Sequence, residues 1–134
     1  MAADGLTTVA SHFGPKETLD RLEADVKARG LTVFARIDHA AGAAAVGLSL
    51  LPTAVLIFGN ARGGTPLMQS NQLIGIELPL KVLVWQDTSG KTWLSYVDPG
   101  TLAQRYGLPP DTAASVNTLS GALRALTTKA AGPG

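Results

Sequence analysis

The chain has 134 residues, of which 46% are apolar and 16% are charged, a composition typical of one globular domain and not of a disordered chain. Its formal net charge of +1 provides no basic field of the kind that nucleic-acid binding depends on, so nucleic acid is not an expected partner. The absence of cysteine excludes disulfides, thiolate nucleophiles and cysteine-based metal sites.

The first half of the chain predicts strands that alternate with helices. Pro15 suits the first position of a helix, and Gly30 suits the position just after a helix ends. Asp38 stands before an alanine-rich stretch and is suited to cap a helix there. We therefore expect, in chain order, a strand at 7–11, a helix at 15–29, a strand at 31–37, a helix reaching about residue 46 and a buried strand at 53–58.

Residues 40–58 contain no charged side chain, but they do not predict a membrane span. Their first half is mostly alanine and glycine, and Ser49, Pro52 and Thr53 interrupt the rest, whereas a spanning helix needs about 20 strongly apolar residues. Residues 1–5 lack the basic and apolar regions of a signal peptide, which predicts a cytoplasmic protein. A periplasmic location stays open, because removal of a signal peptide would leave the same sequence.

The most informative stretch covers residues 56–68, where an apolar run gives way to glycines and then to Thr65-Pro66. A Thr-Pro pair is typical of a helix start, so the stretch predicts a strand, a loop and a short helix at 66–72. Asp98 and Pro99 predict the start of a further helix in the same way. The other elements expected here are an apolar connector at 73–79, a hairpin of strands 81–86 and 92–97, a helix ending at Tyr106, a last helix from about residue 111 and a disordered tail at 131–134.

These elements predict an α+β fold in a single domain over residues 1–134. We expect one mixed, largely antiparallel sheet with helices packed mainly on one of its faces. Such an arrangement leaves an apolar surface uncovered, and the pairing of two copies is the simplest way to cover it. A homodimer is therefore the expected partner state.

Four segments, taken in their order and spacing, carry a family signature: His39–Ala43, Phe58–Asn60, Gly64–Met68 and Leu78–Trp85. In these segments the chain resembles the DUF302 family of small bacterial and archaeal proteins, and the likeness covers about residues 6–126. The resemblance implies a β-α-β(4)-α fold similar to that of the TATA-binding protein, usually as a dimer, and no settled biochemical activity. The fold name is no reason to expect DNA binding, because function depends on sites and not on folds.

The loop from Asn60 to Thr65 is the first candidate site. If a helix starts at Thr65-Pro66, the N–H groups of Gly63, Gly64 and Thr65 have no helical partners and can bind an anion. Arg62 supplies a positive charge beside them, and Asn60 supplies an orienting amide. The alternative is a tight turn between a strand and a helix, in which glycine and asparagine occur for backbone reasons alone.

His39 and Glu77 form the second candidate site, as a general acid or base and its partner. The alternative for His39 is a polar corner next to Asp38, which caps the following helix. The alternative for Glu77 is a structural ion pair with Lys81 or Arg62, since an acid among apolar residues needs a partner.

Three functions remain open from the sequence. The first is a domain that binds a small anionic ligand at Gly63–Thr65, and the second is an enzyme that uses His39 with those amides as an oxyanion site. The third is a purely structural interaction domain. We expect no cofactor and no metal, because His12, His39 and Glu77 lack the spacing of a metal site.

Overall fold

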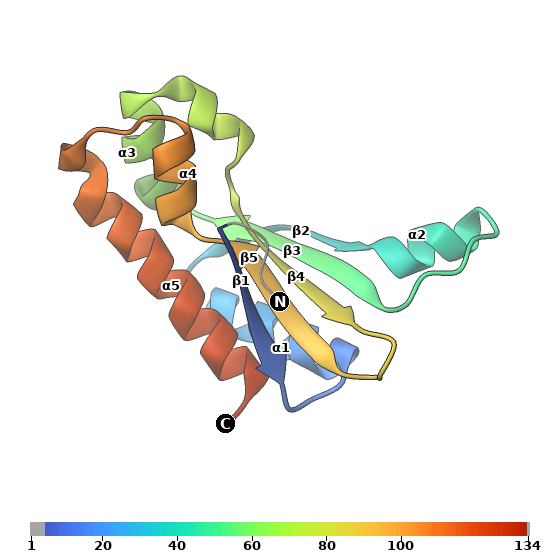
Figure 1. Cartoon of the computed structure of the whole chain (residues 1–134). Coiled ribbons are helices and arrows are strands. Elements are labelled where there is room, and N and C mark those ends of the chain that lie inside the picture. The colour runs from blue at the N-terminus through green and yellow to red at the C-terminus, as the bar shows by residue number, and fades with distance from the viewer. Residues whose placement is uncertain (1–4, 134) are drawn as a thin grey trace.

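Five strands form an antiparallel sheet in the computed structural model, which describes residues 5–133 (Figure 1). Neighbouring strands are antiparallel throughout, from the pair Leu6↔Val97 at one edge to Asp38↔Ala54 at the other. The expected α+β class is therefore confirmed, and the sheet that was expected to be mixed and largely antiparallel is antiparallel in all four strand pairs. The strands lie in the order β1-β5-β4-β3-β2 and are β1 Leu6–Ser11, β2 Thr32–Asp38, β3 Thr53–Gly59, β4 Leu80–Gln86 and β5 Thr92–Val97.

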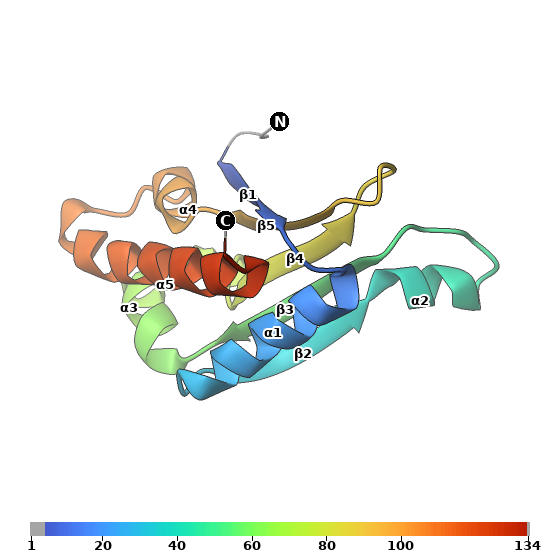
Figure 2. The same ribbon diagram turned by 90° about the horizontal axis from the view of Figure 1, so that it is seen from below.

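Two helices, α1 and α5, lie side by side on one face of this sheet (Figure 2). Together with the strands they give the β-α-β(4)-α order that the resemblance implies. The remaining helices are shorter insertions between strands or before α5. The helices are α1 Pro15–Ala28, α2 His39–Ala45, α3 Ala61–Ser70, α4 Pro99–Arg105 and α5 Ala113–Ala131, with 3-10 helices η1 Gln72–Ile76 and η2 Pro110–Thr112.

The core lies between the sheet and the two long helices. Leu22 and Val26, four residues apart on α1, are fully buried, as are Leu56 of β3 and Leu94 of β5. Each such side chain stabilises the fold by about 1.5–3 kcal/mol relative to an exposed one. Helix α5 contributes an apolar stripe at steps of three and four residues, namely Val116, Leu119, Leu123 and Leu126.

Helix α3 begins at Ala61, so the expected helix start at Pro66 is wrong. Asn60 has extended backbone angles, and its side chain accepts a hydrogen bond from the Gly63 N–H at 2.7 Å. This is the geometry of an N-cap, for which asparagine is among the preferred residues. Pro66 lies inside the helix, where its missing N–H leaves only the carbonyl of Arg62 without a helical donor.

Two further expectations need correction. The connector expected at 73–79 contains a helical turn, η1, because the Asn71 side chain accepts the Leu73 N–H at 3.1 Å. The disordered tail expected at 131–134 is wrong at Ala131, which is the buried last residue of α5. Residue 134 lies outside the described residues. Among residues 5–133, the helices are all too short or too polar to cross a bilayer.

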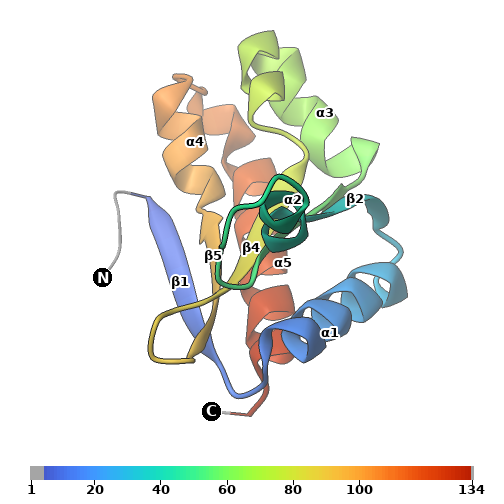
Figure 3. The same ribbon diagram turned by 90° about the vertical axis from the view of Figure 1, so that its right-hand side faces the viewer.

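The uncharged stretch contains α2 and β3, and α2 stands away from the rest of the molecule in Figure 1 and points toward the viewer in Figure 3. We call residues 39–52 the arm. It starts directly after Asp38 at the end of β2 and returns into β3 at Thr53. The arm therefore projects from one end of the sheet, opposite to the end where α3 follows β3.

Two glycine substitutions test the helix boundaries. Gly121 lies within α5 and Gly107 lies just after α4, and a Cβ added at either position would meet no atom within 4 Å. Of the two, Gly107 has a positive φ, at 61°. We expect Gly121→Ala to raise the free energy of unfolding by about 0.5–1 kcal/mol, because alanine loses less entropy in a helix. Gly107→Ala should lower it, because alanine is strained at positive φ. Denaturant unfolding measures both, and changes of the same sign would contradict the assignment.

Candidate functional site

A cavity of about 480 Å³ lies where α3 and η1 approach α5. Its walls come mostly from apolar side chains and glycine backbone, and Arg62 stands among them as the charged residue of the lining. Figure 1 shows α3 held over the upper end of α5, next to the end of β3. The residues of the lining that matter below are Phe34, Arg62, Gly64, Met68, Leu78 and Leu119.

Glycines let α3 approach its neighbours closely around this cavity. A Cβ on Gly63 would lie 3.0 Å from Leu119 Cδ2 of α5, and a Cβ on Gly64 would lie 3.4 Å from Leu78 Cδ1. A Cβ on Gly75 would lie 3.2 Å from the Met68 sulfur. These glycines therefore serve close packing, which is a different role from the one expected in a loop.

The amides expected to bind an anion are already used in the structure. The Gly63 N–H donates to Asn60 Oδ1 at 2.7 Å, and the Gly64 N–H donates to the Asn60 carbonyl at 3.3 Å. Thr65 lies in the second turn of α3 and is not part of the cavity wall. The anion cradle at Gly63–Thr65 is therefore wrong in its donors, because Asn60 starts the helix earlier than the Thr-Pro pair suggested.

The free end of α3 lies two residues earlier. The N–H groups of Ala61 and Arg62 occupy the first turn of the helix, where intrahelical acceptors do not exist, and both residues line the cavity. The Arg62 side chain is exposed and takes part in none of the ion pairs found within residues 5–133. The positive end of the helix dipole and the charged residue Arg62 thus both border an apolar cavity.

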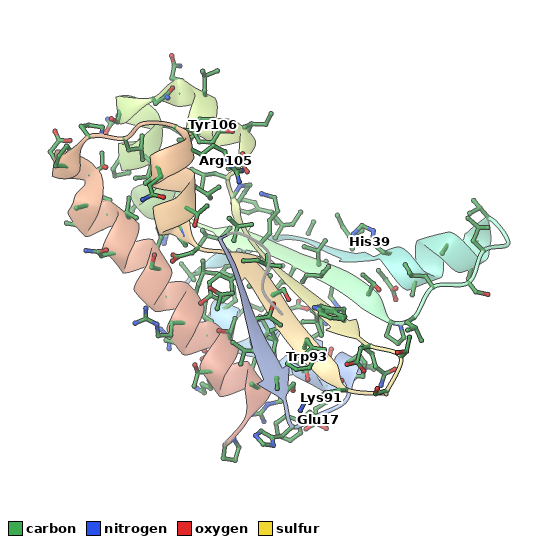
Figure 4. All side chains as sticks on the ribbon, viewed as in Figure 1. Glu17, His39, Lys91, Trp93, Arg105 and Tyr106 are labelled. Carbon is green, nitrogen blue, oxygen red and sulfur yellow. The ribbon has the colours of Figure 1, made fainter. Side chains whose placement is uncertain are left out.

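The Glu77 carboxylate contacts Arg105, the last residue of α4, and Tyr106, which follows it; Figure 4 labels both residues. The Tyr106 hydroxyl donates to Glu77 Oε2 at 2.6 Å, and Arg105 Nη1 lies 3.2 Å from the same oxygen. The Tyr106 hydrogen bond, followed by Arg105, holds the pKa of Glu77 below its ordinary value, and the same bond raises the pKa of Tyr106. The ion pair expected for Glu77 is present, but its partner is Arg105. Lys81 Nζ donates instead to the Glu77 carbonyl, at 2.8 Å.

His39 lies far from Glu77. Asp38 caps α2 as expected, since it accepts the Ala41 N–H at 2.9 Å, and His39 is exposed at the start of that helix (Figure 4). Asp38, which precedes His39, pairs with Ala54 at the start of β3. Leu80, which closely follows Glu77, pairs with Phe58, four residues further along the same strand. At about 3.3 Å per residue these positions are roughly 13 Å apart along the strand. The structure therefore does not bring His39 and Glu77 together as a catalytic pair.

His12 is also remote from both. Its backbone N–H donates to the Ala131 carbonyl at the far end of α5. Within residues 5–133, no group of three or more histidine or acidic side chains is arranged to hold a metal ion.

The cavity wall contains residues that sequence reasoning missed, namely Phe34, Met68, Leu78 and Leu119. Leu119 belongs to the apolar stripe of α5, and its position there is that of a core residue. Phe34 lies where the β2–β3 register shifts between Val33 and Ala35. Apolar residues occupy every second position of 31–37, which predicts a strand, but this alternation does not reveal a bulge. No sequence signal brings these four positions together.

Replacing Tyr106 by phenylalanine tests the environment of Glu77. Because the pKa of Glu77 is lowered in the folded state, its ionised carboxylate stabilises the fold at pH values above the ordinary pKa of 4.5. This stabilisation is lost as the pH falls through the lowered pKa. We expect Tyr106→Phe to reduce the free energy of unfolding at pH 7 and to reduce it clearly less at pH 3. Urea unfolding at the two pH values measures this. The control is Tyr96→Phe, because the hydroxyl of Tyr96 has no side-chain partner among the described residues. Equal losses of unfolding free energy at both pH values for Tyr106→Phe would refute the assignment.

Comparison with known proteins agrees with the fold. A crystal structure of an uncharacterized conserved DUF302 protein from Bacillus stearothermophilus superposes with a TM-score of 0.84 and 25% identity, covering 96% of this chain and 99% of that chain. Two curated relatives, named "Fluoride-specific ion channel FluC 1", come from Brucella suis biovar 1 (strain 1330) and Brucella abortus biovar 1 (strain 9-941). Each is 50% identical over 104 residues, which is 78% of this chain but only 41% and 38% of the relatives. The chain thus spans about two fifths of their length.

The family model described as "Domain of unknown function DUF302" matches residues 7–126, which is most of the chain. The expected resemblance is confirmed by this match and by the similar crystal structure. The chain belongs to the DUF302 family.

Proposed function

We propose that this domain binds a small molecule that has an apolar body and one anionic group. The observation that carries the proposal is the cavity beneath α3. Its volume of about 480 Å³ falls within the range of roughly 300–1,000 Å³ that is typical of ligand pockets, and its wall is predominantly apolar. An apolar ligand body is stabilised there by about 0.8 kcal/mol for each methylene group removed from water.

The anionic group of this ligand meets the start of α3. The N–H groups of Ala61 and Arg62, together with the Arg62 guanidinium, provide donors at the cavity mouth. Asn60 holds the turn through its Oδ1, and the cap makes Ala61 and Arg62 the first residues of the helix. The proposed binding residues are therefore Asn60, Ala61 and Arg62, with Gly64 in the cavity wall.

Binding without chemistry fits this arrangement better than catalysis does. His39 and Glu77 both lie outside the lining of the cavity, and Glu77 is committed to Tyr106 and Arg105. A general acid or base must stand within hydrogen-bonding reach of the group on which it acts.

A series of straight-chain carboxylates tests the proposal. We expect acetate to leave the melting temperature unchanged and hexanoate, octanoate and decanoate to raise it in that order. The gain per methylene corresponds to about a fourfold change in affinity. Thermal melting and titration calorimetry measure the two quantities, and a flat response along the series would sink the proposal.

Variants separate the cavity from the anion site. Gly64→Leu fills the cavity and should remove the response to octanoate, whereas Gly121→Leu, at the exposed position on α5, should leave it unchanged. Arg62→Ala should weaken octanoate binding by about tenfold and leave the binding of the neutral alcohol octanol unaltered. If Gly121→Leu reduced binding as much as Gly64→Leu, the cavity would not be the site.

We also propose, as a second candidate, that the domain acts as an accessory part of a membrane channel. The observation in favour is the 50% identity to part of the Brucella proteins named as fluoride-specific channels. Fluoride itself is a poor ligand for the cavity, because an apolar wall does not offset the loss of hydration of a small anion. The domain would then respond to an amphipathic carboxylate and not to the transported ion. The cytoplasmic location remains a prediction.

Fluoride provides the first check of this second candidate. Sodium fluoride should shift the melting temperature no more than sodium chloride does at equal ionic strength. Fluoride efflux from vesicles that contain the whole Brucella suis protein should change when octanoate is added. An unchanged efflux rate would contradict the accessory role and leave ligand binding by the isolated domain untouched.

A further inference from the structure

The Met68 side chain lies between two glycines of the cavity wall. Gly64 comes four residues before Met68 on α3, so the two positions are neighbours on one face of the helix. A Cβ on Gly64 would lie 3.7 Å from Met68 Cε, and a Cβ on Gly75 of η1 would lie 3.2 Å from the Met68 sulfur. All three residues line the cavity. The methionine side chain therefore fills space that both glycines leave open.

Met68 is the adaptable part of this wall. Leu80 and Leu119, which also line the cavity, are each 8% exposed and belong to the core, so close packing holds them in place. Met68 is only partly buried and packs against that core from outside. Its side chain is unbranched and can change shape to fit an irregular space, which the branched leucine side chains do less readily.

Met68 also lies in the direction in which a bound chain would extend from the start of α3. It follows Arg62 by six residues, which is about 9 Å along the helix axis. Its terminal methyl group reaches back toward Gly64, as the distance to that glycine shows. An apolar chain that runs along α3 from an anionic group at Ala61 and Arg62 therefore meets the thioether of Met68.

We infer that Met68 limits the length of the apolar body that the cavity accepts. The inference rests on the proposed function and deepens it, because it assigns the ligand to straight-chain carboxylates up to a length that one side chain sets. Each methylene group of a ligand strengthens binding only while it leaves water for the cavity. Once the chain reaches the thioether, a further methylene stays in water and adds no affinity. We call this chain length the limit.

The alternative is that Met68 only fills a packing gap. The limit would then be set by the leucines of the wall, Leu78 and Leu119. Shortening Met68 would in that case lower the free energy of unfolding without changing which ligands bind. The two readings therefore differ in the response of the limit, and not in the response of stability.

Titration calorimetry with carboxylates from hexanoate to tetradecanoate, each below its micelle concentration, measures the limit. Met68→Ala removes Cγ, Sδ and Cε and should raise the limit by about three methylene groups. For a ligand three methylenes longer than the wild-type limit, the affinity should rise by about 50-fold. Leu67→Val is the matched control, because Leu67 is a buried neighbour outside the cavity lining and its shortening should leave the limit unchanged.

Gly75→Ala tests the same contact from the opposite side. Apart from its own chain segment, the added Cβ would meet only Met68 within 4 Å, at Sδ and Cγ. The methyl group should therefore displace the thioether into the cavity and lower the limit by about one methylene. In the double variant Gly75→Ala/Met68→Ala the limit should equal that of Met68→Ala, because the methyl group then has no thioether to displace.

Three results would overturn the inference while leaving ligand binding by the cavity in place. They are an unchanged limit in Met68→Ala, a limit that Leu67→Val raises by as much, and an effect of Gly75→Ala that persists when Met68 is absent. If no carboxylate of the series bound to the wild-type chain, the proposed function would fail and this inference with it. Thermal melting establishes that each variant is folded.

Discussion

The structure depends on the one-sided burial of its antiparallel sheet. Leu22 and Val26 of α1 and the apolar stripe of α5 supply a core on one face, and that face alone is covered by the two long helices. Because a sheet presents alternate side chains to opposite sides, the strands that bury Leu56 and Leu94 inward must direct Val55 and Trp93 outward. The face of the sheet opposite to α1 and α5 is therefore left uncovered as a direct consequence of how the core is built.

The cap at Asn60 decides the character of the candidate site. By starting α3 at Ala61, it places Gly63 and Gly64 inside a helix and brings that helix against α5 and η1. The glycines then provide close contact instead of a row of free amides. What remains is an apolar cavity bordered by a positive helix end and by Arg62, and this is the observation on which the proposed ligand rests.

Charged side chains are distributed unevenly over this fold, so that its surfaces differ in polarity. The helix α1 carries ion pairs on its exposed side, including Arg36 of β2 with Asp20 and Glu23. Exposed pairs of this kind add little to stability but keep the surface hydrated. None of the ion pairs found in residues 5–133 involves a residue of the arm, and Glu77 is neutralised locally by Arg105.

The sequence alone determined the α+β class, the strands and the two long helices, because their signals are local. The alternation in 31–37, the stripe of α5 and the Asp38 cap each depend on neighbouring residues in the chain. The family resemblance added the β-α-β(4)-α order.

Tertiary structure decided the start of α3, the partner of Glu77 and the position of the cavity. Asn60 and Thr65-Pro66 are two competing signals for a helix start. The structure uses the start at Asn60, which allows Gly63 to pack closely against Leu119 of α5. Arg105 is 28 residues from Glu77, and no periodic pattern links them. Such contacts join residues that only folding brings together, so the chain order carries no local record of them.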